Sequence, residues 1–230
     1  MSDLEYIIIL ELINKINNAL DKLDNKIDLY LSSLDFISVD IKTIDKLKQI
    51  LYKPKCDHKI EILKEINIKH AHIYCKIKNI SGPVSGILIE YYIRTKYGMI
   101  KNNASECIGD VCYNQTNIEI KISSGGVDHN KFNYVQLRMN HNCNYILTAY
   151  YMNYNNIDIG GELFIFKLNK KEMKKLIFEY GAYAHGAILN LGEITNNDLN
   201  DPTNNKEYCI RPIYGGKCWF ELLKFRIYKI

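Results

Sequence analysis

The sequence predicts an α/β or α+β fold in which helices flank a central mixed β-sheet and a helical N-terminal subdomain precedes it. Over residues 3–33, apolar side chains recur at steps of three and four, which is the period of an amphipathic helix. Over residues 71–230, apolar runs that alternate with period two are mixed with further helical patterns. A chain of 230 residues is also long enough for a substantial core.

The N-terminal subdomain, residues 1–70, is predicted to be a helical layer. Helices are expected over residues 3–33, 41–51 and 57–67. Two interpretations of this layer stay open. It either packs over one side of the sheet or provides a surface for dimerisation or for DNA. The remaining domain, residues 71–230, is predicted to hold the sheet and to end in strands.

The elements of the second domain follow from local patterns. Strands are predicted over residues 72–77, 107–113, 118–122, 132–138, 145–152 and 162–168. Helices are predicted over residues 85–97 and 170–180, and each precedes a glycine, Gly98 or Gly181, that favours a helix end. The other segments are expected to be a turn at 123–126, a polar loop at 190–205 and two or three short strands over 209–230.

Composition limits the function classes only broadly. The net charge of +4 is mildly basic, which is compatible with a nucleic-acid partner without proving one. The seven cysteines form no CxxC pair and no signal peptide is recognised, so we expect a cytoplasmic protein with reduced thiols and no zinc site. The apolar run at residues 7–10 is too short to span a membrane, so no membrane partner is expected.

A candidate catalytic hairpin covers residues 107–122. Turn-forming residues at 114–117 separate two strand-like runs. In the second run, Glu119 and Lys121 share one face and three isoleucines share the other, because side chains alternate along a strand. The hairpin can bring Asp110 beside this pair. A solvated face of an edge hairpin is the alternative, but charged groups on so apolar a strand indicate a function.

These side chains suit metal-dependent hydrolysis of a phosphodiester, in which a metal ion polarises the phosphoryl oxygen and lowers the pKa of the attacking water. Magnesium prefers hard oxygen ligands and keeps several waters, so one or two carboxylates suffice. Asp110 and Glu119 supply them, and the backbone carbonyl of Ile120 is a candidate for a further ligand. Lys121 is expected to orient or deprotonate the water, or to offset charge on the phosphorus.

A second copy of the same pattern provides an internal control. Asp158 is followed by Glu172 and Lys174, again two residues apart. This copy lies in a predicted helix, where residues two apart point in directions about 200° apart. We therefore expect Glu119 and Lys121 to converge, and Glu172 and Lys174 to diverge.

The motif resembles that of the PD-(D/E)XK nuclease superfamily and, within it, of Type II restriction endonucleases. The resemblance rests on Asp110, eight intervening residues, and Glu119–Lys121 on adjacent strands, and at motif level it covers residues 85–170. Gly109 stands where the family often has proline. The resemblance implies a restriction-endonuclease-like fold, Mg²⁺ as cofactor, and another glutamate near the metal on the preceding helix. Glu90 fits that place, and a surface charge is the alternative.

Candidate DNA contacts follow the hairpin. Gln136 and Arg138 alternate along a predicted strand, which suits base readout in a groove or phosphate binding. Similar Gln-x-Arg strands follow the catalytic lysine in enzymes that this chain resembles, and a solvated strand face is the alternative. The remaining candidates are short polar or imidazole side chains, for which an Asn-rich turn or a structural role is the alternative: Ser123, Ser124, His141, Asn142, Asn153, Asn155 and His185.

Taken together, these features predict a Type II restriction endonuclease that cuts double-stranded DNA at a short site with Mg²⁺. The resemblance also implies a homodimer on a palindromic site, because a two-fold dimer matches the symmetry of such a site. One alternative is a PD-(D/E)XK repair, recombination or viral nuclease without strict sequence specificity. The other is a non-enzymatic interaction module that binds a protein partner through its N-terminal helices.

Overall fold

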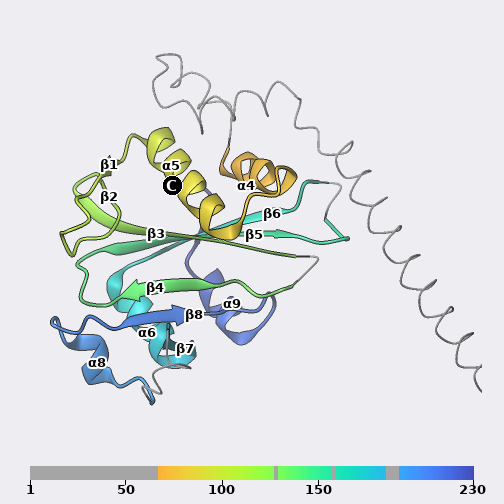
Figure 1. Ribbon diagram of the computed structural model, residues 1–230. Coiled ribbons are helices and arrows are strands. Elements are labelled where there is room, and N and C mark those ends of the chain that lie inside the picture. Colours follow the sequence, from red (N-terminus) through yellow and green to blue (C-terminus); the bar gives the residue numbers. More distant parts are fainter. Residues whose placement is uncertain (1–66, 127–128, 157–158, 185–191) are drawn as a thin grey trace, which may run out of the picture.

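A mixed sheet forms the centre of the fold in the computed structural model, which describes residues 67–126, 129–156, 159–184 and 192–230 (Figure 1). Within these residues the sheet has six strands, of which β3 and β5 are parallel while every other neighbouring pair is antiparallel. Their order across the sheet is β1 (Ile100–Lys101), β2 (Val111–Tyr113), β3 (Thr116–Gly126), β5 (Asn144–Met152), β6 (Glu162–Leu168) and β9 (Arg226–Ile227). The predicted central mixed sheet is thus confirmed.

Helices cover both faces of this sheet. One face carries α4 (Ile68–Ile77) and α5 (Gly82–Tyr97) (Figure 1). The other face carries a small antiparallel sheet and three helices: β4 (Tyr134–Arg138), β8 (Glu207–Ile210), β7 (Gly181–Tyr183), α6 (Lys170–Tyr180), α8 (Asn196–Asn200) and α9 (Lys217–Leu223). None of the helices in the described part of the chain combines the length with the apolar character needed to cross a bilayer.

Alternation along the strands separates the two largest hydrophobic clusters of the core. Ile118 and Ile120 of β3 pack with residues of α4 and α5. Tyr145 of β5, which pairs with Glu119 in the parallel register, packs instead in the cluster of the second sheet, α6 and α9. Paired residues of neighbouring strands point to the same face. Glu119 and Lys121 therefore project toward the layer that contains the second sheet.

Several predicted elements are confirmed. The helix expected over 85–97 is α5, which begins three residues earlier and ends at Gly98 in the left-handed conformation (φ 63°). The helix over 170–180 and the strand over 162–168 have the predicted bounds. The strands expected over 132–138 and 145–152 are β4 and β5, each with a slightly different start.

The segment 72–77 is helical, so the prediction of a strand there was wrong. It belongs to α4, which begins in a reciprocal cap at Asn67. The Asn67 side chain accepts a hydrogen bond from the His70 N–H at 3.0 Å, and His70 Nδ1 accepts one from the Asn67 N–H at 3.3 Å. Such a cap satisfies helix donors that otherwise have no partner, and it outweighs a short alternating pattern.

The turn predicted at 123–126 was also wrong, because β3 continues in register with β5 as far as Gly126 opposite Met152. Its glycines suggested a turn, but Gly126 serves a close approach of two strands. It adopts φ 141°, and a Cβ there would lie 1.6 Å from the Met152 carbonyl oxygen. Only glycine fits such a position without a shift of the backbone.

Three further differences occur. The first hairpin strand begins at Val111 instead of residue 107. The polar loop expected over 190–205 contains α8, which is capped reciprocally by Thr195 and Asp198. The tail contains short strands, as expected, in β8 and β9, but α9 lies between them after Gly216. This helix buries Trp219 and Leu222, which are three residues apart and so lie on one helix face.

The predicted N-terminal subdomain lies almost wholly outside the described residues. The helices expected over 3–33 and 41–51 fall there, as does the one over 57–67 except for its last residue. The boundary predicted after residue 70 lies within α4. The two interpretations of the N-terminal layer, as packing or as interaction surface, stay predictions.

Candidate active site

The predicted catalytic hairpin is formed by β2 and β3. They are joined by the two-residue turn Asn114–Gln115, in which both residues adopt positive φ (48° and 61°). This conformation matches the twist of the flanking strands and fixes their register. Val111 pairs with Ile118, so the same register extended by one residue places Asp110 opposite Glu119.

Asp110 is fixed to the neighbouring strand by its own carboxylate. Its Oδ2 accepts a hydrogen bond of 2.8 Å from the backbone N–H of Ile120. In a strand, the N–H and the carbonyl of one residue point to the same side. The Ile120 carbonyl therefore faces the edge on which Asp110 lies, as a ligand at this site requires, and its role stays a prediction.

Glu119 and Lys121 converge as predicted. Glu119 is only 5 % exposed, and its Oε1 lies 2.5 Å from the ammonium nitrogen of Lys121. Its other oxygen, Oε2, lies 3.9 Å from Nδ1 of His141. The buried carboxylate thus has one oxygen paired with a cation, while the second faces an imidazole.

The electrostatics of Asp110 show that the carboxylates share one environment. Burial raises the pKa of Asp110, and the charge of Glu119 raises it further, against the opposing effects of Lys121 and the Ile120 N–H. Two carboxylates close together in a poorly solvated place disfavour the ionised form. A cation between them would reverse this effect.

Glu90 reaches the same group of charges from α5. Burial raises its pKa, and the charge of Asp110 raises it as well, whereas Arg94, Lys101 and Lys121 act in the opposite direction. Buried neighbours such as Ile89 and Ile93 hold the helix against the sheet. The sequence pattern predicted the helix but not this packing. The structure thus brings Glu90 into the surroundings of Asp110 and Lys121.

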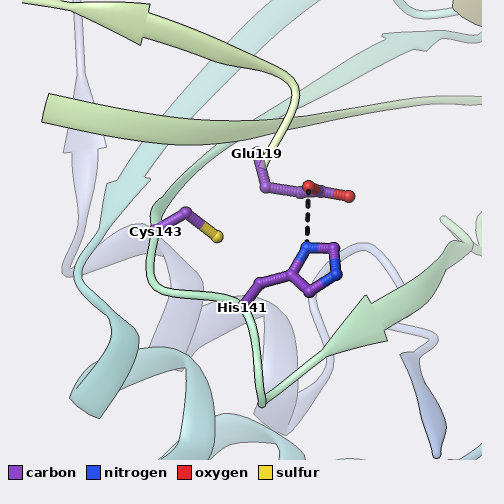
Figure 2. Close-up of side chains that lie close together, drawn as sticks. All are labelled: Glu119, His141 and Cys143. Carbon is purple, nitrogen blue, oxygen red and sulfur yellow. Dashed lines mark ion pairs between the residues drawn. The ribbon is translucent and has the colours of Figure 1, made fainter. Parts of the chain in front are cut away.

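His141, predicted as a DNA contact, lies beside Glu119 together with Cys143 (Figure 2). One ligand atom from each of Glu119, His141 and Cys143 lies within 4.8 Å of the others. Burial lowers the pKa of His141, and the charges of Arg138 and Lys121 lower it further. Burial, followed by the charge of Glu119, raises the pKa of the Cys143 thiol to about 12.

The sequence did not indicate Cys143 as a site residue. It stands one residue before β5, and the parallel pairing of β5 with β3 brings it close to Glu119. Parallel strands require a crossover, so this proximity comes from contacts that are distant in sequence. The one local signal is that His141 and Cys143 are two residues apart and lead into a strand.

Gln136 and Arg138 lie in the second sheet. A bulge between Tyr134 and Leu137 interrupts the pairing of β4 with β8, and Gln136 within it has φ 56° and is exposed. Arg138 forms an ion pair with Glu207. The simple alternation assumed from the sequence does not hold at the bulge, and contact of either side chain with DNA stays a prediction.

Two other DNA-reading candidates lie on the hairpin strand. The Ser123 Oγ accepts a hydrogen bond of 2.9 Å from the backbone N–H of Asn133. Ser124 Oγ lies 3.3 Å from Nδ1 of His72, on the side of the sheet that α4 covers. Both hydroxyls thus have protein partners, and Ser124 points away from the face of Glu119.

The remaining candidates lie in loops. Asn142 is exposed, and its backbone N–H donates to the carbonyl of Cys107. The Asn153 side chain accepts from the Asn155 N–H at 3.0 Å, which gives the Asn-rich turn that was the alternative reading. Asn153 stands eight residues beyond Tyr145, the partner of Glu119, so roughly 26 Å of strand separates it from the site. His185 lies outside the described residues.

The site therefore combines carboxylate oxygens from three elements with one lysine. Asp110, Glu119 and Glu90 offer hard donors, which are the ligands that Mg²⁺ prefers. The pKa values of Asp110 and Glu90 are raised by burial and by neighbouring charge, so a bound divalent cation would stabilise both ionised groups. These residue types suit a magnesium ion, and its binding here stays a prediction.

Comparison with other proteins adds no family to this description. No protein-family model matches the sequence, and a search of curated proteins finds no match either. What the protein does must therefore be inferred from the chemistry of the site itself.

Proposed function

We propose that the protein is a Mg²⁺-dependent deoxyribonuclease of the PD-(D/E)XK type that cuts double-stranded DNA as a Type II restriction endonuclease. The observation that carries the proposal is the register of the hairpin, which sets Asp110 opposite the paired side chains of Glu119 and Lys121. The mixed sheet with helices on both faces supports the restriction-endonuclease-like fold that the motif implies.

The carboxylates are the proposed metal ligands. Asp110 and Glu119 bind the ion directly, with the Ile120 carbonyl and Glu90 as further ligands. The hydrogen bond from the Ile120 N–H holds the Asp110 carboxylate against β3, so this ligand is oriented before any cation binds. When bound, Mg²⁺ polarises the phosphoryl oxygen and lowers the pKa of the attacking water.

Lys121 is proposed as the group that handles the water or the developing charge. Its ammonium lies on the same strand face as Glu119, at 2.5 Å from Oε1, and is therefore held at the edge of the carboxylate cluster. An ammonium in this position orients the attacking water or stabilises negative charge on the phosphorus. Because Glu119 and Lys121 are two residues apart on β3, the proposed metal ligand and the proposed water-handling group lie on one rigid strand.

Sequence specificity and symmetry belong to the same proposal. Gln136 and Arg138 are proposed to contact DNA, and Arg138 would then exchange its partner Glu207 for a base edge or a phosphate. The enzyme is proposed to act as a homodimer on a palindromic site, because both half-sites then meet the same protein surface. Sedimentation with and without DNA tests the dimer.

The test is incubation with long, unmodified viral or bacterial DNA and MgCl₂, followed by gel electrophoresis. Discrete fragments that vanish when a chelator replaces magnesium are expected. Continuous degradation, or cutting only at ends or branches, would reject site-specific cleavage and favour the repair, recombination or viral alternative. No cleavage of any DNA would reject the nuclease and leave the interaction module.

A further inference from the structure

His141, which is partly buried, differs from the buried His72, which also lies against β3. His72 has both ring nitrogens near hydroxyl partners, with Nδ1 3.3 Å from Ser124 Oγ and Nε2 3.4 Å from Thr148 Oγ1. In contrast, Nδ1 of His141 is buried and has no hydrogen-bond partner within the described residues. A buried polar atom without a partner is destabilising unless something else binds it.

The carboxylate beside His141 does not satisfy this nitrogen. Glu119 Oε2 lies 3.9 Å away, which is beyond hydrogen-bonding distance. The imidazole nitrogen and a carboxylate oxygen thus face each other across a gap.

The third member of the cluster is a sulfur atom. Glu119 comes from β3, whereas His141 and Cys143 come from the segment before β5, and the three side chains point into a common space (Figure 2). The Tyr145 hydroxyl, which donates to the Arg138 carbonyl at 3.3 Å, also interacts with the Cys143 side chain. Partners of this second layer orient metal ligands in known sites.

We propose that Glu119, His141 and Cys143 form a second cation site, which binds a divalent transition ion of the zinc class. Zinc bonds to imidazole nitrogen and carboxylate oxygen are each about 2.0–2.2 Å long, so one ion can bridge the 3.9 Å between Nδ1 and Oε2 with little movement. Three protein ligands leave a fourth position for water.

The donor set separates this site from the magnesium site. Imidazole and thiolate select zinc, cobalt and related ions, whereas carboxylate and carbonyl oxygens select magnesium. A bound transition ion also removes the proton from a coordinating thiol, so the neutral thiol of the free protein becomes a thiolate. This site was not predicted from the sequence, because its ligands lack the paired spacing of zinc-binding motifs.

Glu119 belongs to both sites, so under the proposed function the two metal ions compete for its carboxylate. Its Oε1 faces Lys121 and its Oε2 faces His141. An ion of the zinc class on Oε2 adds positive charge next to the magnesium position and removes a ligand from it. Zinc is therefore inferred to inhibit cleavage by competition with magnesium.

The experiment is a titration of chelator-treated protein with Co²⁺, which replaces zinc and has visible spectra. We expect one bound Co²⁺ per chain, with the visible bands of a four-coordinate ion and a near-ultraviolet charge-transfer band from thiolate. Cys143→Ser removes the charge-transfer band, and His141→Gln weakens Co²⁺ binding at least 10-fold. Cys107→Ser is the matched control, because its thiol is exposed and lies outside the cluster, and it keeps the full spectrum.

The outcomes separate the two proposals. Absence of the charge-transfer band in the wild-type protein, or its persistence in Cys143→Ser, overturns the zinc-class site whatever the protein does to DNA. The band without any cleavage supports the site and rejects the nuclease. If the protein cuts DNA, the Zn²⁺ concentration that inhibits the wild type is expected to be at least 10-fold below the concentration that inhibits Cys143→Ser. Each rate is measured relative to the zinc-free rate of the same variant. Equal sensitivity of the two proteins to Zn²⁺ overturns the inferred competition between zinc and magnesium. Urea unfolding of each variant shows whether it is folded.

Discussion

The chain carries the pattern Glu-x-Lys in both β3 and α6, and the two copies differ in what their side chains can reach. In β3, Glu119 and Lys121 meet at 2.5 Å. In α6, Glu172 turns back to accept from the Asn169 N–H at 2.7 Å, while Lys174 donates to Asn200 Oδ1 at 2.9 Å. The same two residue types form a candidate site on the strand, whereas on the helix the glutamate forms a cap. The reason is that side chains repeat every two residues along a strand and about every 3.6 residues along a helix, which decides whether they converge.

The surroundings of the two copies differ as well. Glu119 is buried beside Asp110, whose pKa it raises. Glu172 lies in the first turn of α6, where a carboxylate interacts favourably with the helix dipole. Asp158, the aspartate that precedes the second copy, lies outside the described residues. The comparison therefore predicts that equal substitutions in the two copies have different consequences.

The largest difference is expected between Lys121→Ala and Lys174→Ala. Loss of Lys121 removes the group proposed to handle the water or the developing charge, so Mg²⁺-dependent cleavage should fall by about 100- to 1000-fold. Lys174→Ala removes a hydrogen bond to Asn200 on the surface and should leave cleavage unchanged. Initial rates on one DNA substrate measure both, and a gel-shift assay in Ca²⁺ checks that each variant still binds DNA. Full activity in Lys121→Ala would reject the assigned site.

Replacement of Asp110 is expected to stabilise the fold at pH 7, although most substitutions destabilise it. Its pKa is raised above 3.8 by burial and Glu119, so the native state holds this proton more tightly than the unfolded state does. Stability from this group is therefore present at low pH and falls as pH rises from 3.8 through the raised pKa. Asp110→Asn lacks this loss, so in chelator it should unfold at a higher urea concentration than the wild type at pH 7, while its DNA cleavage is lost.

Asp201 provides the control of opposite sign. Hydrogen bonds from Thr203 lower the pKa of Asp201, so its stabilising effect is present above 3.8 and is lost as pH falls toward the lowered pKa. Asp201→Asn should therefore be less stable than the wild type at pH 7. If both variants shift the urea midpoint in the same direction, the crowding of carboxylates at Asp110 is contradicted.

The smallest effect is expected at Glu172. Glu172→Ala removes one half of the reciprocal cap with Asn169 and should lower the free energy of unfolding by about 1 kcal/mol. Cleavage should stay at the wild-type rate at temperatures where the variant is folded. Urea unfolding and a cleavage assay on the same preparation measure both quantities. A loss of cleavage greater than the loss of folded protein would contradict the assignment of Glu172 as a helix cap without a role in the site.

Local patterns in the sequence were sufficient for part of the fold. The bounds of α6 follow from its apolar period between Asn169 and Gly181, and alternation along β3 predicted that Glu119 and Lys121 share a face. Where local signals competed, the prediction failed. The alternating run at 72–77 is helical because a cap forms at Asn67, which the pattern of apolar residues does not register.

The rest of the site depends on contacts between distant segments. Pairing of β3 with β5 brings Cys143 and His141 to Glu119, and packing of α5 on the sheet brings Glu90 near Asp110. No local spacing encodes a parallel pairing, because its register is fixed only when the whole core assembles. For this reason His141 was predicted as a DNA contact, and Cys143 was not predicted at all.

The most direct test of the central claim is calorimetric titration of Mg²⁺, or of Ca²⁺ as a substitute that slows cleavage, into the protein with bound DNA. The wild type and Glu172→Gln should release or absorb heat of binding, whereas Asp110→Ala should show none. Equal binding in Asp110→Ala, or no metal binding in the wild type, would contradict a metal site at the hairpin.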